Sequence, residues 1–277
     1  MGHNINITLP DGSQKSFAPG ITAADVAGSI GEGLLRATVA ARIDGELRDL
    51  NTPIHKDSEL SLITTKSDEA HEILLHSTAH LMAQAVKELY PDVMITIGPA
   101  VKNQFYYDFD IDAPFNENDL LQIEQKMKEI SKRGLIVERK ALSRQEALDT
   151  FAAMKEIYKV ELIEEIDSDE QLTAYQQGDF IDLCRGPHIS STAKIKYFKL
   201  LSSSGAYWRG DENNKMLKRI YGTSFFDKKS LKAYLNMLEE AKKRDHRKLG
   251  KEMDIYAFDD EVGPGLPLWL PNGAVMA

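Results

Sequence analysis

EAHEILLHSTAHLMAQAVKEL, residues 69–89, has apolar residues at helical spacing and stops just before Pro91. We expect one long helix here. His76 and His80 lie four residues apart, so their side chains are neighbours on one side of that helix. Histidine pairs at this spacing are common in helices without a catalytic role. The pair therefore indicates a functional site only if a second motif with reactive side chains lies close to it.

The second motif, CRGPH (residues 184–188), begins with Cys184, the only cysteine of the chain, and ends with His188. Gly-Pro cannot continue a helix, and residues 180–184 alternate like a strand that runs into this loop. Loops at strand ends often carry catalytic groups. If the fold joins the two motifs, three imidazoles and one thiol meet. Zinc accepts this ligand set, which equally suits metal-free ester hydrolysis by polarised water.

Two charged residues, Asp182 and Lys159, are further candidates for the same site. Asp182 lies two residues before the cysteine, so in an extended strand the two side chains point to the same face. A strand-end hydrogen bond is an equally good explanation for an aspartate at this place. Lys159 follows Tyr158 in a polar stretch, and composition alone makes it a surface lysine.

The stretch FYYDF (residues 105–109) predicts a strand. Alternation places Tyr107 on one face with both phenylalanines and Tyr106 on the other. A tyrosine that faces a pocket can stack on a nucleobase or hydrogen-bond a ribose.

Composition narrows the class of protein. The chain has 277 residues, a net charge of −9 and a single cysteine, which excludes an internal disulfide and fits a cytoplasmic location. It lacks an apolar run long enough to span a membrane and the core of a signal peptide. Residues 227–251 carry nine Lys or Arg against four acids. This segment is either a solvated helix face or a helix that contacts phosphates.

The chain divides into four segments by pattern. Short alternating runs around a capped helix predict a β-grasp domain over residues 1–64. Residues 65–226 mix helices and strands without strict alternation, which predicts an α+β domain. A basic linker helix is expected over residues 227–249. The Gly- and Pro-rich residues 250–277 are too few to fold alone and read as the start of a further domain that has been cut off.

These motifs together resemble the N-terminal part of bacterial threonyl-tRNA synthetases. The matching stretches, in the family's order, are HSTAHLM (76–82), IGP (97–99), FYYDF (105–109), DLCRGPH (182–188) and GLPLWLPNG (265–273). The resemblance covers essentially the whole chain. One departure is Gln104, where the family usually has a small residue, at the rim of the expected pocket.

The resemblance implies a TGS-type β-grasp domain, an editing domain that hydrolyses mischarged Ser-tRNA(Thr), and the start of a truncated class II aminoacylation domain. It implies catalytic roles for His76, His80, Lys159, Asp182, Cys184 and His188, and substrate contacts for Gly98 and Tyr107. Tyr107 is expected to hold the terminal adenosine, and Gly98 to let the substrate approach closely. Cys184 is expected to position groups or water without forming a covalent intermediate.

The resemblance also sets expectations for cofactors and partners. The partner is the 3′ end of tRNA(Thr). ATP, magnesium and zinc are expected only for the full-length enzyme, which is expected to be a homodimer, whereas this chain is expected to be a monomer without a cofactor. The motifs of the His/Cys set also look like those of the alanyl-tRNA synthetase editing domain, where the set holds zinc. Two alternatives stay open: a zinc-dependent esterase that uses His76, His80, Cys184 and His188, and a non-enzymatic RNA-binding or regulatory module.

Overall fold

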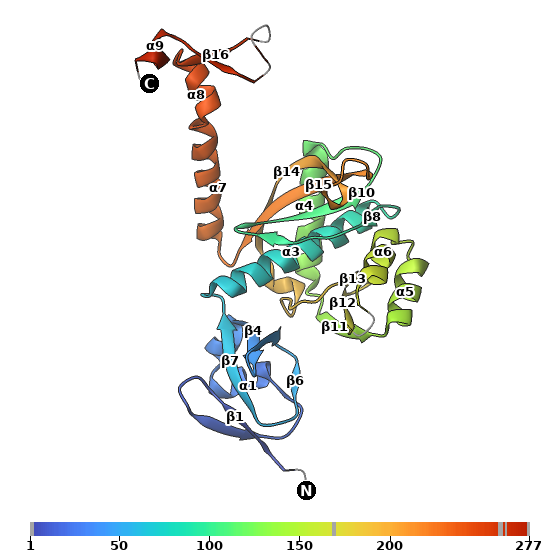
Figure 1. Ribbon diagram of the computed structural model, residues 1–277. Coiled ribbons are helices and arrows are strands. Elements are labelled where there is room, and N and C mark those ends of the chain that lie inside the picture. Colours follow the sequence, from blue (N-terminus) through green and yellow to red (C-terminus); the bar gives the residue numbers. More distant parts are fainter. Residues whose placement is uncertain (1–2, 168–169, 260–262, 264, 276–277) are drawn as a thin grey trace. The chain divides into compact units, whose positions relative to one another are not determined.

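The computed structural model describes residues 3–167, 170–259, 263 and 265–275 (Figure 1). It separates into two compact units, Met1–Asp227 and Lys228–Ala277. The first unit is mixed α+β, as the sequence predicts. Val262 and Pro264 of the expected C-terminal domain start lie outside the described residues. Within the described ranges, no helix is long and apolar enough to cross a lipid bilayer.

The N-terminal part of the first unit is the predicted β-grasp domain. Its five-stranded sheet has the order β2-β1-β7-β4-β5, and β1 pairs with β7 in parallel. Thr22 caps α1 in a capping box with Asp25, which fixes the start of the helix under the sheet. The bounds are β1 (Ile5–Thr8), β2 (Gln14–Phe17), β3 (Ile21–Thr22), α1 (Ala23–Ile30), α2 (Glu32–Ala37), β4 (Thr38–Ile43), β5 (Glu46–Asp49), β6 (Pro53–Ile54) and β7 (Ser58–Thr64).

A second sheet, with the order β14-β15-β10-β8 and β9 paired to β10, supports the long helix α3. Phe105, Tyr107 and Phe109 alternate inward from β10 and are fully buried, which confirms the predicted face. Helix α4 packs on α3 and β14. The bounds are α3 (Asp68–Leu89), β8 (Met94–Ile95), β9 (Ala100–Val101), β10 (Gln104–Asp110), α4 (Glu117–Arg133), η1 (Thr192–Lys194), β14 (Tyr197–Tyr207), η2 (Trp208–Gly210) and β15 (Met216–Phe225).

A smaller three-stranded sheet, in the order β11-β12-β13, carries the loop that follows residue 183. Phe151 and Ile163 form its core with residues of β12. Figure 1 shows α5 and α6 beside this sheet, and β13 runs back toward α3. The bounds are β11 (Val137–Leu142), α5 (Arg144–Ala153), α6 (Ile157–Glu165), β12 (Leu172–Gln177) and β13 (Phe180–Leu183).

The second unit differs from the single basic helix expected over residues 227–249. Helix α7 (Lys228–Lys243) ends, and α8 (His246–Glu252) begins after two intervening residues. The carbonyl of Asp245 accepts hydrogen bonds from Lys248 and Leu249, and aspartate favours the position at which a helix starts. A helix start at Asp245 therefore divides the segment. The unit ends with β16 (Tyr256–Phe258), β17 (Pro267–Trp269) and α9 (Pro271–Ala274).

Candidate functional site

Helix α3 presents both histidines of the first motif on one side. Ser67 caps the helix by accepting a hydrogen bond from the backbone of Ala70, and two acidic residues in the first turn favour its positive end. The His76 and His80 rings meet edge to face with centroids 5.1 Å apart. The predicted helix and the shared face of the histidines are thus both present.

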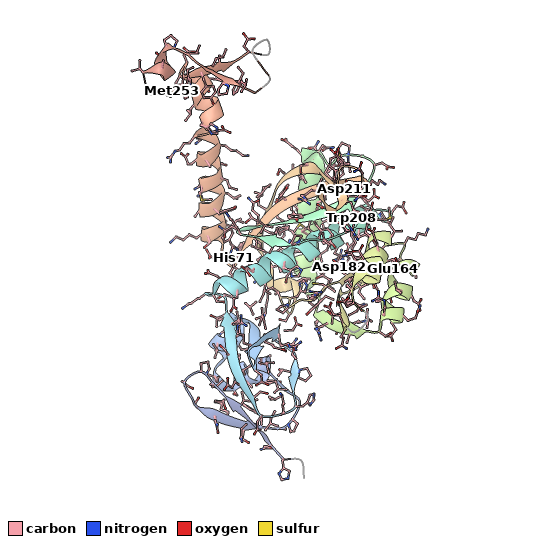
Figure 2. The ribbon with its side chains drawn as sticks, in the orientation of Figure 1. His71, Glu164, Asp182, Trp208, Asp211 and Met253 are labelled. Carbon is pink, nitrogen blue, oxygen red and sulfur yellow. The ribbon has the colours of Figure 1, made fainter. Side chains whose placement is uncertain are left out.

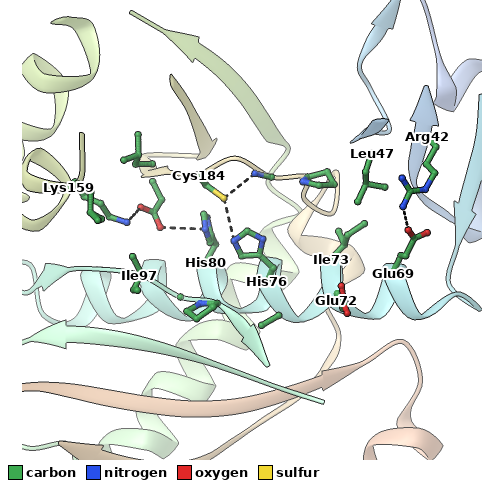
Figure 3. Close-up of a pocket in the computed structure, with 18 residues that line it drawn as sticks. Arg42, Leu47, Glu69, Glu72, Ile73, His76, His80, Ile97, Lys159 and Cys184 are labelled. Carbon is green, nitrogen blue, oxygen red and sulfur yellow. Dashed lines mark hydrogen bonds and ion pairs between the residues drawn. The ribbon is translucent and has the colours of Figure 1, made fainter. Parts of the chain in front are cut away.

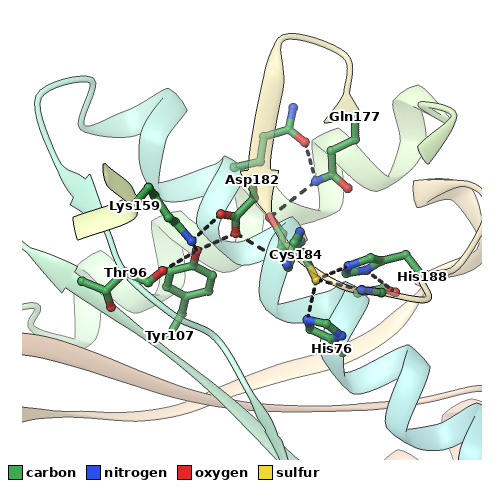
Figure 4. Close-up of polar contacts among 12 residues, drawn as sticks. His76, Thr96, Tyr107, Lys159, Gln177, Asp182, Cys184 and His188 are labelled. Carbon is green, nitrogen blue, oxygen red and sulfur yellow. Dashed lines mark hydrogen bonds and ion pairs between the residues drawn. The ribbon is translucent and has the colours of Figure 1, made fainter. Parts of the chain in front are cut away.

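The loop after β13 brings the thiol to these imidazoles. Cys184 Sγ lies 3.3 Å from His76 Nε2 and 3.2 Å from His188 Nε2, and it accepts a hydrogen bond from the backbone of Gly186. Gly186 has φ = 71°, and a Cβ there would lie 1.8 Å from the hydroxyl oxygen of Tyr175. Only glycine therefore fits this turn. Figure 4 shows the thiol between the two rings.

Asp182 and Lys159 form an ion pair that solvent barely reaches. Their side chains are 1% and 2% exposed. The Tyr107 hydroxyl donates to Asp182 Oδ2 at 2.6 Å and accepts from Lys159 Nζ at 3.1 Å, while His80 Nε2 lies 3.5 Å from the same carboxylate oxygen. Asp182 is buried in the first unit (Figure 2), and Figure 4 shows its carboxylate directed toward Lys159 and Tyr107. Lys159 is therefore a buried residue of the site and not the surface lysine that composition indicated.

Glu156, one turn before Lys159, fixes this lysine in place. Its backbone carbonyl accepts from the amide of Lys159 at the start of α6. Its side chain is fully buried and accepts from Lys87 Nζ of α3 at 2.6 Å and from the amide of Ile95 at 2.8 Å. Helix α6 is thereby tied both to α3 and to the edge of the large sheet. Nothing local in the sequence marks Glu156 for this role.

Burial keeps the imidazole and thiol groups uncharged. Desolvation lowers the pKa of His76, and it lowers the pKa values of His80 and His188 well below their usual range, with mutual repulsion adding to the effect. Desolvation also raises the pKa of Cys184 to about 12. At neutral pH the site therefore holds neutral imidazoles that can accept a proton, beside a thiol that stays protonated.

Next to these groups is a pocket of about 630 Å³, a size that suits a small ligand. Its wall includes His76, His80 and Gly98, and it extends to Arg42 and Leu47 of the β-grasp domain (Figure 3). The remaining lining residues are Glu69, Glu72, Ile73, Ile97, Pro99, Ala100, Lys159, Leu162, Asp182, Leu183, Cys184, Gly186 and Pro187.

The structure gives Tyr107 and Gly98, the two expected substrate contacts, roles in packing within the protein. Tyr107 is 0% exposed, so its ring offers no surface on which adenosine could stack. Burial, followed by the charge of Asp182, raises the pKa of its hydroxyl well above the usual range, and the hydroxyl orients the carboxylate. A Cβ at Gly98 would lie 2.2 Å from the Tyr107 ring. Gly98 is thus required for packing against Tyr107, and it also lines the pocket.

Ser77 is a site residue that motif reasoning did not single out. Its Oγ lies 3.0 Å from His188 Nδ1 and accepts from the amide of Ile189 at 2.9 Å. One hydroxyl on α3 therefore orients the His188 ring and fixes the loop behind it. The only sequence signal is its place between the two histidines of the first motif.

The four groups of the two motifs are also compatible with zinc. One ligand atom from each of His76, His80, Cys184 and His188 lies within 4.8 Å of the others. Tetrahedral zinc with bonds of about 2.0–2.3 Å needs ligand atoms roughly 3.3–3.8 Å apart. The Cys184 Sγ distances of 3.3 Å to His76 Nε2 and 3.2 Å to His188 Nε2 are close to that spacing. The donor set therefore fits a metal, although each group also has partners within the protein.

Comparisons with known proteins agree with this architecture. Residues 5–64 match the TGS domain, and residues 172–221 match the threonyl and alanyl tRNA synthetase second additional domain. Three similar proteins are threonine–tRNA ligases. Those of Pelobacter propionicus, Listeria monocytogenes and Staphylococcus aureus are 56%, 54% and 55% identical over 98–99% of this chain. The chain spans 42–43% of the length of these relatives.

Proposed function

We propose that this chain has an editing activity. Two observations support the proposal: the chain matches a TGS domain followed by a synthetase second additional domain, and it is similar to threonine–tRNA ligases over nearly its whole length. Its substrate is seryl-tRNA(Thr), and the reaction is hydrolysis of the ester at the 3′ end. The observation that carries this proposal is the pocket wall, where neutral imidazoles lie beside a buried Asp182–Lys159 ion pair.

The groups of the pocket fit the steps of ester hydrolysis. In this proposal, neutral His76, half-buried and lining the pocket, accepts a proton from water as the water oxygen bonds to the ester carbonyl carbon. The bond from that carbon to the ribose oxygen then breaks, and the leaving ribose oxygen receives the proton. Asp182 holds the substrate ammonium group, and Lys159 stabilises the carbonyl oxygen as it becomes negative. His80 and His188 orient these partners, and Cys184 spaces the rings of His76 and His188.

A hydrolytic site of this kind is needed because binding alone discriminates poorly between serine and threonine. Serine lacks one methyl group of threonine, and a pocket that admits threonine rejects serine by only about 1–3 kcal/mol. A second site that hydrolyses the smaller ester supplies the missing selectivity. The proposal therefore requires that the pocket accept serine and exclude the additional methyl group.

The test is a deacylation assay on matched esters. Purified chain is mixed with seryl-tRNA(Thr) or threonyl-tRNA(Thr), and ester loss is followed against a protein-free control. The proposal expects rapid loss of the seryl ester and background loss of the threonyl ester. A folded protein that leaves both esters at the background rate contradicts it.

Zinc-dependent hydrolysis is a second candidate, favoured by the spacing of the four ligand atoms. If zinc is bound, His76, His80, Cys184 and His188 would hold it, and the metal would lower the pKa of a bound water. Metal analysis of the purified chain, with deacylation measured before and after chelation, separates the two. Activity that survives in metal-free protein excludes this candidate.

A third candidate is an RNA-binding module without hydrolysis, supported by the basic residues of the segment 227–251. It expects RNA affinity that falls steeply with salt and that His76→Ala leaves unchanged, with no ester loss at all.

We also propose the domain limits 1–64, 65–226, 227–249 and 250–277. ATP-dependent aminoacylation, with magnesium, zinc and a homodimer, is proposed only for a full-length protein like the relatives.

A further inference from the structure

A carboxylate of the β-grasp domain reaches the CRGPH loop of the candidate site. Asp49, the last residue of β5, accepts a hydrogen bond from the backbone amide of His188 at 2.9 Å through Oδ1. Its other oxygen, Oδ2, accepts from the Tyr175 hydroxyl at 2.6 Å. One side chain therefore holds both the backbone of the CRGPH loop and a residue of the strand β12 beneath it.

Asp49 is itself firmly anchored in its own domain. It pairs with Ala40 across β4 and β5, and its carbonyl accepts from the amide of Thr52. The next residue, Leu50, is buried in the β-grasp core. The carboxylate is thus presented by a rigid turn, and rigid supports are those that hold a site within the tolerance that chemistry needs.

Tyr175 transmits this anchoring to the reactive groups. Its ring contacts the His188 ring with centroids 4.4 Å apart, and it lies directly opposite Asp182 in the pairing of β12 with β13. Its hydroxyl occupies the space that a Cβ at Gly186 would need. His188 in turn contacts Cys184. Asp49 therefore touches the framework of the site at two points, although it does not line the pocket.

We propose that Asp49 is a positioning residue of the editing site, so that the β-grasp domain forms a structural part of the hydrolytic centre. Through its hydrogen bonds to the His188 amide and the Tyr175 hydroxyl, it holds the loop that places His188 and Cys184. The catalytic part of this inference rests on the proposed function. The positioning part can be measured without any tRNA.

Matched variants separate positioning from charge. Asp49→Ala removes both hydrogen bonds. Asp49→Asn can keep both, since its carbonyl oxygen accepts from the His188 amide and its NH₂ group donates to the Tyr175 oxygen. Asp57→Ala is the control. This exposed β-grasp carboxylate also accepts from a backbone amide, that of Asn6, but it makes that bond within its own domain.

Two readouts are taken on each variant in the presence of a chelator. The first is the single-turnover rate of seryl-tRNA(Thr) deacylation. The second is the rate at which iodoacetamide alkylates the only thiol of the chain, Cys184. Displacement of catalytic groups by about 1 Å can cost roughly 100-fold in rate, so we expect Asp49→Ala to lower deacylation by about 10- to 100-fold. We expect it to speed alkylation severalfold, whereas Asp49→Asn and Asp57→Ala stay within about twofold of the parent chain on both readouts.

Each outcome decides the inference. If Asp49→Ala matches the parent on both readouts, or if Asp49→Asn is as defective as Asp49→Ala, positioning by these hydrogen bonds is wrong. If Asp49→Ala does not fold, Tyr175→Phe removes one of the two bonds and must still speed alkylation. If the parent chain alkylates slowly and the variants follow the expected order, but no chain hydrolyses the ester, the proposed function fails and the positioning role stands.

Discussion

The candidate site has two buried parts that differ in charge: one holds a pair of opposite charges, and the other holds neutral groups. In the ion-pair cluster of Lys159, Asp182 and Tyr107, opposite charges are held together, and the Tyr107 hydroxyl hydrogen-bonds to both charged groups. In the imidazole–thiol cluster of His76, Cys184 and His188, desolvation works against charge and the groups stay neutral. The first cluster can supply a fixed field and the second can move protons. Each cluster should therefore fail in its own way when it is altered.

The largest effect is expected from Asp182→Ala. This change leaves Lys159 as a buried charge without its partner, and breaking a buried pair in this way typically costs about 3–5 kcal/mol of unfolding free energy. Loss of the oriented carboxylate should also lower deacylation by about 1,000-fold, as loss of a preorganised electrostatic group does. Urea unfolding and single-turnover deacylation measure the two effects.

A double variant then divides stability from catalysis. Lys159→Met combined with Asp182→Leu replaces the pair by apolar groups of similar size, which is often neutral for folding. We expect the double variant to recover most of the unfolding free energy and none of the activity. Recovery of activity would show that the ion pair serves only the fold, and the contrast between the two clusters would be lost.

The next effect is expected from His76→Ala in the imidazole–thiol cluster. Loss of a general base typically costs about 100-fold or more in rate, while a half-buried ring should cost little stability. His71→Ala is the matched control, because His71 lies on the same helix but contacts Ser224 and Phe225 on β15. Equal deacylation rates for His76→Ala and the parent chain would remove His76 from the mechanism.

A smaller effect is expected in the dependence of stability on pH. The pKa values of His76, His80 and His188 are lowered from 6.5, chiefly by burial. As the pH falls below 6.5, the unfolded chain takes up protons that the folded chain refuses, so the unfolding free energy falls. The loss is at most about 1.4 kcal/mol per pH unit for each imidazole. Urea unfolding between about pH 7 and about pH 5 measures it.

One substitution assigns that slope to the site. His188→Gln removes an imidazole whose pKa lies well below the usual range, so it should flatten the decline of stability below pH 6.5. A parent chain whose unfolding free energy is constant or rises as the pH drops through this window would mean that the imidazoles are charged in the folded state.

The sequence predicted those parts of the site that local pattern determines. Helical spacing placed His76 and His80 on one face, and alternation placed Tyr107 with the buried phenylalanines. It could not predict that the Tyr107 hydroxyl meets Lys159, 52 residues away, because no local signal records a contact of that range. For the same reason Lys159 looked like a surface residue.

Asp49 shows the same limit more sharply. Its contact with His188 joins residues 139 positions apart and depends on how the β-grasp sheet packs against the rest of the first unit. Hydrophobic pattern predicted both domains, but not the polar contacts between them. In the basic segment, prediction failed over a short range of sequence. Charge and periodicity predicted one helix, whereas the structure has two, because α8 starts after Asp245.

The smallest effect is expected from Cys184→Ser, and it tests the imidazole–thiol cluster most directly. With its pKa raised to about 12, the thiol is protonated at neutral pH and is a poor nucleophile. Its contacts with His76 and His188 indicate a spacer, and a hydroxyl can take that place. Deacylation should therefore stay within about tenfold of the parent rate, whereas a thiolate nucleophile would lose about 10⁴-fold or more. A loss of that size would make Cys184 the reacting atom, and the two clusters would then differ as nucleophile and support instead of as proton carrier and fixed field.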